Sequence, residues 1–176
     1  MRITETALSG LFVVDITPFG DERGHFARTF CAEEFARAGL PTTFVQCSTS
    51  FNRRQGTLRG LHYQDDPCPE GKLVRCTRGA AFDVAVDLRP GSPSYCRWHA
   101  SELTADNTRA LYIPPGFAHG FQTLADGTEI LYQMTEFYRA DLARGVRWND
   151  PSFGIGWPLT DPILSPRDAG YPDFRR

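Results

Sequence analysis

The sequence predicts an all-β protein built as a sandwich or barrel of short antiparallel strands, and three observations lead to this fold class. Runs rich in β-branched and aromatic residues recur along the 176 residues. Gly, Pro, Asn and Asp separate these runs, as in "PFGDERG", "RPGSPS" and "ADGTE". The run "FDVAVDL" alternates, with Phe82, Val84 and Val86 on one face and Asp83 and Asp87 on the other. A jelly roll is the commonest such architecture with an interior large enough for a ligand.

The expected strands follow one another with a single helix near the N-terminus. They are "LFVVDIT" (11–17), "GHFARTF" (24–30), "TFVQCST" (43–49), "TLRGLHYQ" (57–64), "LVRCTRG" (73–79), "AAFDVAVDL" (80–88), "RALYIP" (109–114) and "EILYQMTEFY" (129–138). Only "AEEFARAG", residues 32–39, looks helical, and Gly39 and Pro41 end it. The Pro-rich tail "WPLTDPILSPRDAGYPDF" is expected to be irregular. With no repeat or internal linker, residues 1–176 are expected to form a single domain.

Composition narrows the class of function. Lys+Arg 19 against Asp+Glu 21 gives a net charge of -2, so no basic field would recruit nucleic acid or an anionic membrane. No apolar run approaches the roughly 20 residues that span a bilayer, and the N-terminus lacks the features of a signal peptide. The five cysteines form no CxxC pair, which favours reduced thiols over disulfides or a thiolate metal site. We therefore expect a cytoplasmic protein.

The stretch "TLRGLHYQ" offers the first candidate for chemistry. In a regular strand Arg59 and His62 face opposite ways, because side chains alternate. A bulge at Gly60 would bring both to one side, and glycine within a strand is a signal for a bulge. A histidine standing alone would more often be a core residue with a satisfied ring.

A second stretch, "PPGFAHGF", contains P-x-G-x-x-H and resembles the second motif of the cupin superfamily. In metal-binding cupins the first motif supplies two histidines as H-x-H, but here the matching site reads His62, Tyr63 and Gln64. A neutral amide is a weak ligand beside imidazole and carboxylate. A metal-binding cupin is therefore disfavoured.

Lys72 and Tyr132 are further candidates, each with an ordinary structural alternative. Lys72 begins a strand and could point its ammonium into the mouth of a barrel, or it could be a solvated lysine at a strand end. Tyr132 could be an acid or a core tyrosine bonded to the backbone. Tyr138 lies six residues further, so in a regular strand it shares a face with Tyr132.

Over nearly its whole length the chain resembles the dTDP-4-dehydrorhamnose 3,5-epimerase family of nucleotide-sugar epimerases. The matching stretches are "DERGHFARTF", "FVQCSTS", "GTLRGLHYQ", "GKLVRC", "GAAFDVAVDLRPGSPSY", "LYIPPGFAHGF", "ILYQMTEFY", "GVRWNDPSFGIGWP" and "ILSPRD". The resemblance implies a cupin-type jelly roll, or double-stranded β-helix, that forms a homodimer and binds a nucleotide sugar without metal or cofactor.

The resemblance also implies roles for individual residues. It makes His62 the general base, Tyr132 the general acid, Asp168 the carboxylate that orients the base, and Lys72 the cation beside the C4 oxygen of the sugar. The residues that it assigns to substrate binding are Arg23, Phe26, Gln46, Ser48, Arg59, His119, Tyr138 and Arg167. Inverting a carbon beside a ketone requires this set, because a base and an acid must flank the ring while a fixed cation stabilises the enolate.

The chain departs from the family pattern at Arg28, Ser48 and Ala143, where an acid, an asparagine and an acid are expected. These departures leave the nucleotide and the sugar less defined than the reaction. A mono-epimerase acting at C3 or C5, or an epimerase of another nucleotide-linked 4-keto sugar, is the main alternative. A metal-dependent cupin and a non-catalytic sugar-nucleotide binding module are disfavoured, because a binding module does not need the base, the acid and the cation.

Overall fold

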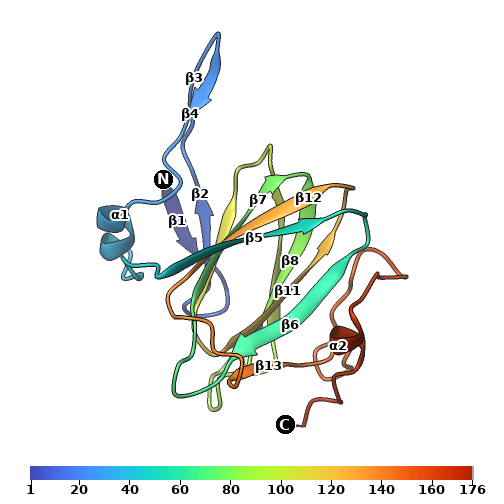
Figure 1. Ribbon diagram of the computed structural model, residues 1–176. Helices are drawn as coiled ribbons and strands as arrows, with labels where there is room; N and C mark the ends of the chain where they lie inside the picture. The colour runs from blue at the N-terminus through green and yellow to red at the C-terminus, as the bar shows by residue number, and fades with distance from the viewer. Residues whose placement is uncertain (176) are drawn as a thin grey trace.

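The computed structural model describes residues 1–175 and places two antiparallel sheets face to face (Figure 1). The strands are β1 (Arg2–Glu5), β2 (Phe12–Asp15), β3 (Phe19–Asp21), β4 (Gly24–Phe26), β5 (Gln46–Asn52), β6 (Leu58–Gln64), β7 (Lys72–Arg78), β8 (Ala80–Asp87), β9 (Trp98–Thr104), β10 (Ala110–Ile113), β11 (Phe117–Thr123), β12 (Thr128–Met134) and β13 (Ala143–Gly145). The helices are α1 (Ala32–Arg37) and α2 (Pro166–Ala169). The predicted all-β jelly-roll class is confirmed.

One sheet has the order β1-β2-β10-β7-β12-β5, and the other has the order β13-β6-β11-β8-β9. Apolar side chains from the inner faces of both sheets form the core between them. They include Val74 and Ile130 from the first sheet and Leu103 and Phe121 from the second, each at most 1 % exposed. This interdigitation is what holds the two sheets together.

The outer faces of the sheets are covered by different segments. The C-terminal segment packs Phe153 and Trp157 against Val84 and Val86 of β8, so both faces of this strand are buried. Helix α1 packs Phe35 on the outer face of the other sheet. In the part of the chain that the structure describes, no helix is long and apolar enough to cross a membrane.

Both ends of the chain show small differences from expectation. Helix α1 stops at Arg37, and Gly39 follows with φ +71. The tail, expected to be irregular, contains α2, where Ser165 caps the helix by accepting a hydrogen bond from the backbone N–H of Asp168 and Pro166 occupies the first turn. A serine N-cap followed by proline is a local signal for the start of a helix. Because several other prolines surround it, the sequence predicts an irregular structure for the whole tail.

The predicted bulge in β6 is confirmed. His62 lies opposite His119 of β11, whereas Arg59 lies opposite Phe121, so three steps along β6 correspond to two along β11. Gly60 has φ +137, and a Cβ there would lie 2.5 Å from the Cα of Gly120. Only glycine permits this close approach, and the extra residue turns Arg59 and His62 to the same side.

Strands β3 and β4 form a hairpin that projects away from the two sheets (Figure 1). We call residues 19–26 the arm. Phe19 and Phe26 lie opposite each other on it and are 73 % and 76 % exposed. Two large apolar side chains exposed together on an extension are typical of a segment that contacts another molecule.

Candidate active site

The strand register places four of the predicted site residues on the inner face of the six-stranded sheet. Tyr132 of β12 lies opposite Ser48 of β5 and Val74 of β7. Gln46 and Lys72 lie two positions from Ser48 and Val74 on the same strands and therefore share that face. Because Val74 belongs to the core between the sheets, all four side chains face the other sheet.

The opposing sheet contributes Arg59, His62 and His119 from its inner face. Arg59 lies opposite Phe121, which belongs to the same core, and His62 lies opposite His119. The ring of His119 in turn contacts the ring of Tyr132 across the sandwich, with a distance of 6.0 Å between ring centroids. The two sheets thus bring residues far apart in the sequence to one place.

His62 forms a close pair with Asp168 of α2, since 2.6 Å separates its Nε2 from a carboxylate oxygen. The Asp168 side chain is 5 % exposed and that of His62 is 38 % exposed, so the histidine is the accessible member. Burial alone would raise the pKa of Asp168, but hydrogen bonds from His62, Ser165 and the backbone of Gly60 outweigh burial and lower it. Asp168 is therefore ionised and fixes the orientation of the His62 ring.

Tyr132 lies beside a second histidine–carboxylate pair. The Nε2 of His119 lies 2.9 Å and 3.1 Å from the two carboxylate oxygens of Asp83, and the two residues are 4 % and 0 % exposed. Burial raises the pKa of the Tyr132 hydroxyl above its usual value, and the negative charge of Asp83 adds to this, while the positive charge of Arg59 opposes it. The Tyr132 hydroxyl is therefore protonated at neutral pH.

Arg59 is held in place by Asn52, an almost fully buried residue of β5. The Nε of Arg59 donates to the side-chain oxygen of Asn52 over 2.8 Å. The Asn52 amide nitrogen donates to the backbone oxygens of Ser50 and Thr128, which fixes the direction of the asparagine. The guanidinium is therefore oriented before any ligand arrives, which suits a bidentate bond to phosphate oxygens.

A pocket of about 200 Å³ opens beside His62. Its lining residues are His62, Tyr63, Gln64, Glu70, Lys72, Tyr138, Ala143, Arg144 and Arg167. Tyr138 lies beyond the end of β12 and is 58 % exposed, so it lies at the rim and not within the sandwich beside Tyr132. The pocket brings together His62, Lys72, Tyr138 and Arg167, which come from four separate segments of the chain.

Gln64 occupies the position at which a metal cupin would carry a histidine, and its amide is used to hold the backbone. Its nitrogen donates to the carbonyls of Cys68 and Phe137, over 2.6 Å and 3.1 Å, and its oxygen accepts from the N–H of Arg139 over 2.7 Å. These bonds tie together the two loops that flank the pocket. Within residues 1–175, no three or more His, Cys, Asp or Glu side chains form a group that could hold a metal ion.

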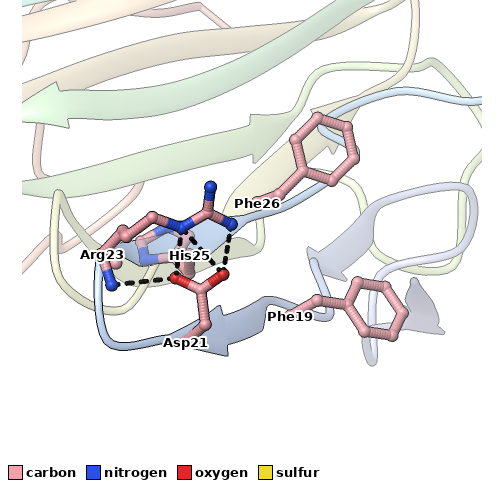
Figure 2. Close-up of a pocket in the computed structure, with 6 residues that line it drawn as sticks. Phe19, Asp21, Arg23, His25 and Phe26 are labelled. Atoms are coloured by element: carbon pink, nitrogen blue, oxygen red, sulfur yellow. Dashed lines mark hydrogen bonds and ion pairs between the residues drawn. The ribbon is translucent and has the colours of Figure 1, made fainter.

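The structure does not bring Arg23 and Phe26 to this pocket. Both lie on the arm, where Arg23 donates to the carboxylate of Asp21 and Phe26 is the strand partner of Phe19 (Figure 2). Because the arm points away from the sheets that carry His62 and Tyr132, these two residues cannot serve the site of their own chain in this conformation (Figure 1).

Sequence reasoning missed three partners of the site residues, namely Asp83, Asn52 and Glu70. Asp83 had a visible signal, because the alternating run placed it with Asp87 on the face opposite to that of Val84. Nothing in the sequence indicated that His119 would be its partner. Asn52 and Glu70 gave no signal, since a polar residue at a strand end is usually solvated.

Comparisons with known proteins identify the family of the chain. A family model described as dTDP-4-dehydrorhamnose 3,5-epimerase matches residues 5–176. The dTDP-4-dehydrorhamnose 3,5-epimerase of Shigella flexneri is 44 % identical over 99 % of this chain and 96 % of that enzyme. A dTDP-4-dehydrorhamnose 3-epimerase from Streptomyces niveus is 37 % identical over 96 % of this chain and 81 % of its own length.

Solved structures agree over the whole fold. The crystal structure of dTDP-4-dehydrorhamnose 3,5-epimerase from Bacillus anthracis, with TDP and PPi bound, has a TM-score of 0.96 and 40 % identity, covering 98 % of this chain and 99 % of that one. The Legionella pneumophila enzyme in complex with dTDP-4-keto-L-rhamnose has a TM-score of 0.91 and 38 % identity, covering 97 % of this chain and 90 % of that one. The chain therefore belongs to the dTDP-4-dehydrorhamnose 3,5-epimerase family, whose members are carbohydrate epimerases of the isomerase class.

Proposed function

We propose that the protein inverts C3 and C5 of dTDP-4-dehydro-6-deoxy-D-glucose to give dTDP-4-dehydro-L-rhamnose. Membership of the family supports this reaction, as does the keto-sugar bound to the Legionella pneumophila relative. The observation that carries the proposal is the placement of His62, paired with Asp168 of α2, on one sheet and of a protonated Tyr132 on the opposite sheet. A base and an acid on opposing sheets can reach opposite faces of one sugar ring.

The first step removes a proton from the carbon beside the C4 ketone. The Nε2 of His62 faces Asp168, so this nitrogen carries the hydrogen and Nδ1 is the free basic nitrogen. As Nδ1 takes the proton, the electron pair of the C–H bond moves into the ring and onto the C4 oxygen, forming an enolate. Lys72 lines the same pocket, and its ammonium is the cation that stabilises this oxygen as charge develops.

The second step returns a proton to the opposite face of the carbon. The Tyr132 hydroxyl donates its proton to the enolate carbon, and the electron pair on the C4 oxygen re-forms the ketone. The enzyme is left with a protonated His62 and a deprotonated Tyr132, and exchange with water restores both. The same pair then acts at the second carbon, which lies on the other side of the same ketone.

The remaining residues bind the substrate. Arg59, whose guanidinium Asn52 orients, and Arg167 at the rim are proposed to hold the pyrophosphate. Tyr138 is proposed to stack on thymine, because it is an exposed ring at the rim of the pocket. The residues proposed to bind the sugar and its neighbouring groups are Gln46, Ser48 and His119.

The protein is further proposed to be a homodimer in which the arm of each subunit completes the site of its partner. The exposure of Phe19 and Phe26 and the distance of Arg23 from the pocket of its own chain support this arrangement (Figures 1 and 2). All five cysteines are free, which fits the reducing cytoplasm as the location of the enzyme.

A hybrid dimer tests the exchange of arms. Subunits carrying His62→Ala and Arg23→Ala are co-expressed with different tags and purified as the mixed dimer. One of its two sites then combines an intact His62 with an intact partner arm, so about half the wild-type turnover per dimer is expected. If the arm served its own subunit, neither site would be intact and the hybrid would stay inactive. A monomer in light scattering would also contradict the proposal.

The reaction is tested by incubating chelator-treated protein with dTDP-4-keto-6-deoxyglucose in deuterium oxide and locating deuterium by NMR and mass spectrometry. Label at both C3 and C5, with the inverted product trapped by a reductase, is the expected result. Label at one carbon would indicate a mono-epimerase, the second candidate, for which the Streptomyces niveus 3-epimerase is a precedent among the relatives. Absence of label would refute both, and activity that returns only with added metal would indicate a metal-dependent enzyme.

A further inference from the structure

The ammonium of Lys72 already has a carboxylate partner in the pocket. Its Nζ lies 2.9 Å from a carboxylate oxygen of Glu70, and each of the two side chains is 12 % exposed. Both residues line the pocket that contains His62. An ion pair shielded to this degree is held more firmly than a pair on an open surface.

The backbone between the two residues is fixed, so the pair is built into the fold. The N–H of Gly71 donates to the Thr135 hydroxyl over 2.8 Å, and the carbonyl of Gly71 accepts from the Thr135 N–H over 3.0 Å. A Cβ at Gly71 would lie 3.0 Å from the Tyr112 hydroxyl oxygen, which shows how closely this segment is packed. Glu70 and Lys72 are two residues apart in an extended segment, and their side chains therefore point to the same side.

The arginines that line the same pocket have other partners. Arg144 lies 3.6 Å from a carboxylate oxygen of Asp65. Arg167 donates to the Tyr171 hydroxyl over 2.8 Å. Among the cations that line the pocket, Glu70 therefore pairs with Lys72, whereas Arg144 and Arg167 have partners elsewhere.

An ammonium group has three donors, so a bond to Glu70 leaves two for the ketone oxygen of a sugar. A lysine side chain has a flexible four-carbon stem, and without a partner it would sample many positions. Electrostatic stabilisation of a forming charge requires that the cation be in place before the charge appears. A fixed carboxylate bonded to the ammonium meets this requirement.

We propose that Glu70 is a positioning residue for epimerisation, which acts through Lys72 by holding its ammonium where negative charge develops on the C4 oxygen. The inference rests on the proposed function, because it gives a task to the partner of a residue assigned there. It predicts that Glu70 influences the formation of the enolate and not the binding of the nucleotide.

The test measures the rate of deuterium incorporation into dTDP-4-keto-6-deoxyglucose by purified full-length protein. In Glu70→Ala the rate at saturating substrate should fall roughly tenfold, the order of effect expected when a catalytic group loses its alignment. The affinity for dTDP should stay at its wild-type value, and the melting temperature is measured to show that the variant is folded at the assay temperature. Glu70→Gln keeps an acceptor oxygen and should recover part of the loss, whereas Glu102→Ala, an exposed glutamate on β9, serves as the matched control.

A double-mutant cycle separates positioning from an independent effect. If Glu70 acts through Lys72, then Glu70→Ala should cause no further loss in a protein that already carries Lys72→Ala. Losses that multiply, or a Glu70→Ala rate equal to that of the wild type, would overturn the inference. Should Glu70→Ala fail to fold, the same cycle is run with Glu70→Gln. A wild-type protein that incorporates no deuterium would refute the proposed function itself, before any variant is compared.

Discussion

Replacing Asp168 with asparagine tests the base and its partner together. The change keeps the shape of the side chain, which is 5 % exposed, and removes the charge that faces the Nε2 of His62 across 2.6 Å. A hydrogen bond to a charged group contributes about 1.5–3 kcal/mol and a neutral one about 0.5–1.5 kcal/mol. The loss is therefore about 1–2 kcal/mol, and since about 1.4 kcal/mol corresponds to a factor of ten, the rate should fall five- to thirty-fold.

The assay follows deuterium exchange and formation of inverted product at saturating dTDP-4-keto-6-deoxyglucose. In the proposed mechanism every proton that leaves the sugar passes to His62, so both rates should fall by the same factor while dTDP affinity stays constant. Asp161→Asn, an exposed aspartate in the same C-terminal segment, is the control. An unchanged exchange rate would refute the assignment of His62 as the base supported by Asp168.

The same variant predicts a dependence of stability on pH. The pKa of Asp168 is lower in the folded protein than in the unfolded chain, because its hydrogen bonds outweigh its burial. Its contribution to the free energy of unfolding is therefore complete above the unfolded pKa of about 3.9 and is lost as pH falls through the folded pKa. The gap in stability between wild type and Asp168→Asn should narrow below about pH 4, as measured by urea unfolding.

Three further changes test other parts of the structure. Tyr132→Phe keeps the ring beside His119 but removes the hydroxyl, so the rate of inversion should fall about 100-fold or more while deuterium exchange persists. An equal loss of inversion and exchange would exclude Tyr132 as the acid. Gly60→Ala adds a Cβ 2.5 Å from the Gly120 Cα, at a residue whose φ is +137. It should destabilise the protein by about 2 kcal/mol or more, which lowers the melting temperature by at least about 4 °C. A melting temperature within about 1 °C of wild type would contradict the bulge geometry. Burial would raise the pKa of Asp87, but hydrogen bonds from Arg89 and two serines outweigh burial and lower it. Asp87→Asn should therefore lower the free energy of unfolding by about 2–3 kcal/mol near neutral pH and by less below about pH 4. A difference in unfolding free energy that does not change with pH would refute this.

Much of the fold was predictable because it depends on short-range patterns. Alternation in "FDVAVDL" identified a strand, and the glycine within "TLRGLHYQ" indicated the bulge that aligns Arg59 with His62. Strand faces follow from a period of two residues, which any short run displays. The short helix α2 was missed because its start signal of serine and proline is embedded in a proline-rich tail.

The sequence by itself determined the all-β class, the bulge in β6 and, through the resemblance to a family, which side chains to consider for chemistry. Only the tertiary structure decided what those side chains touch. Asp168 meets His62 across 106 residues of chain, and His119 meets Asp83 across 36. It also separated Arg23 and Phe26 from the pocket by placing them on the arm. The physical reason is that local periodicity sets the side toward which a residue points, whereas its partner depends on how distant strands and loops close upon one another.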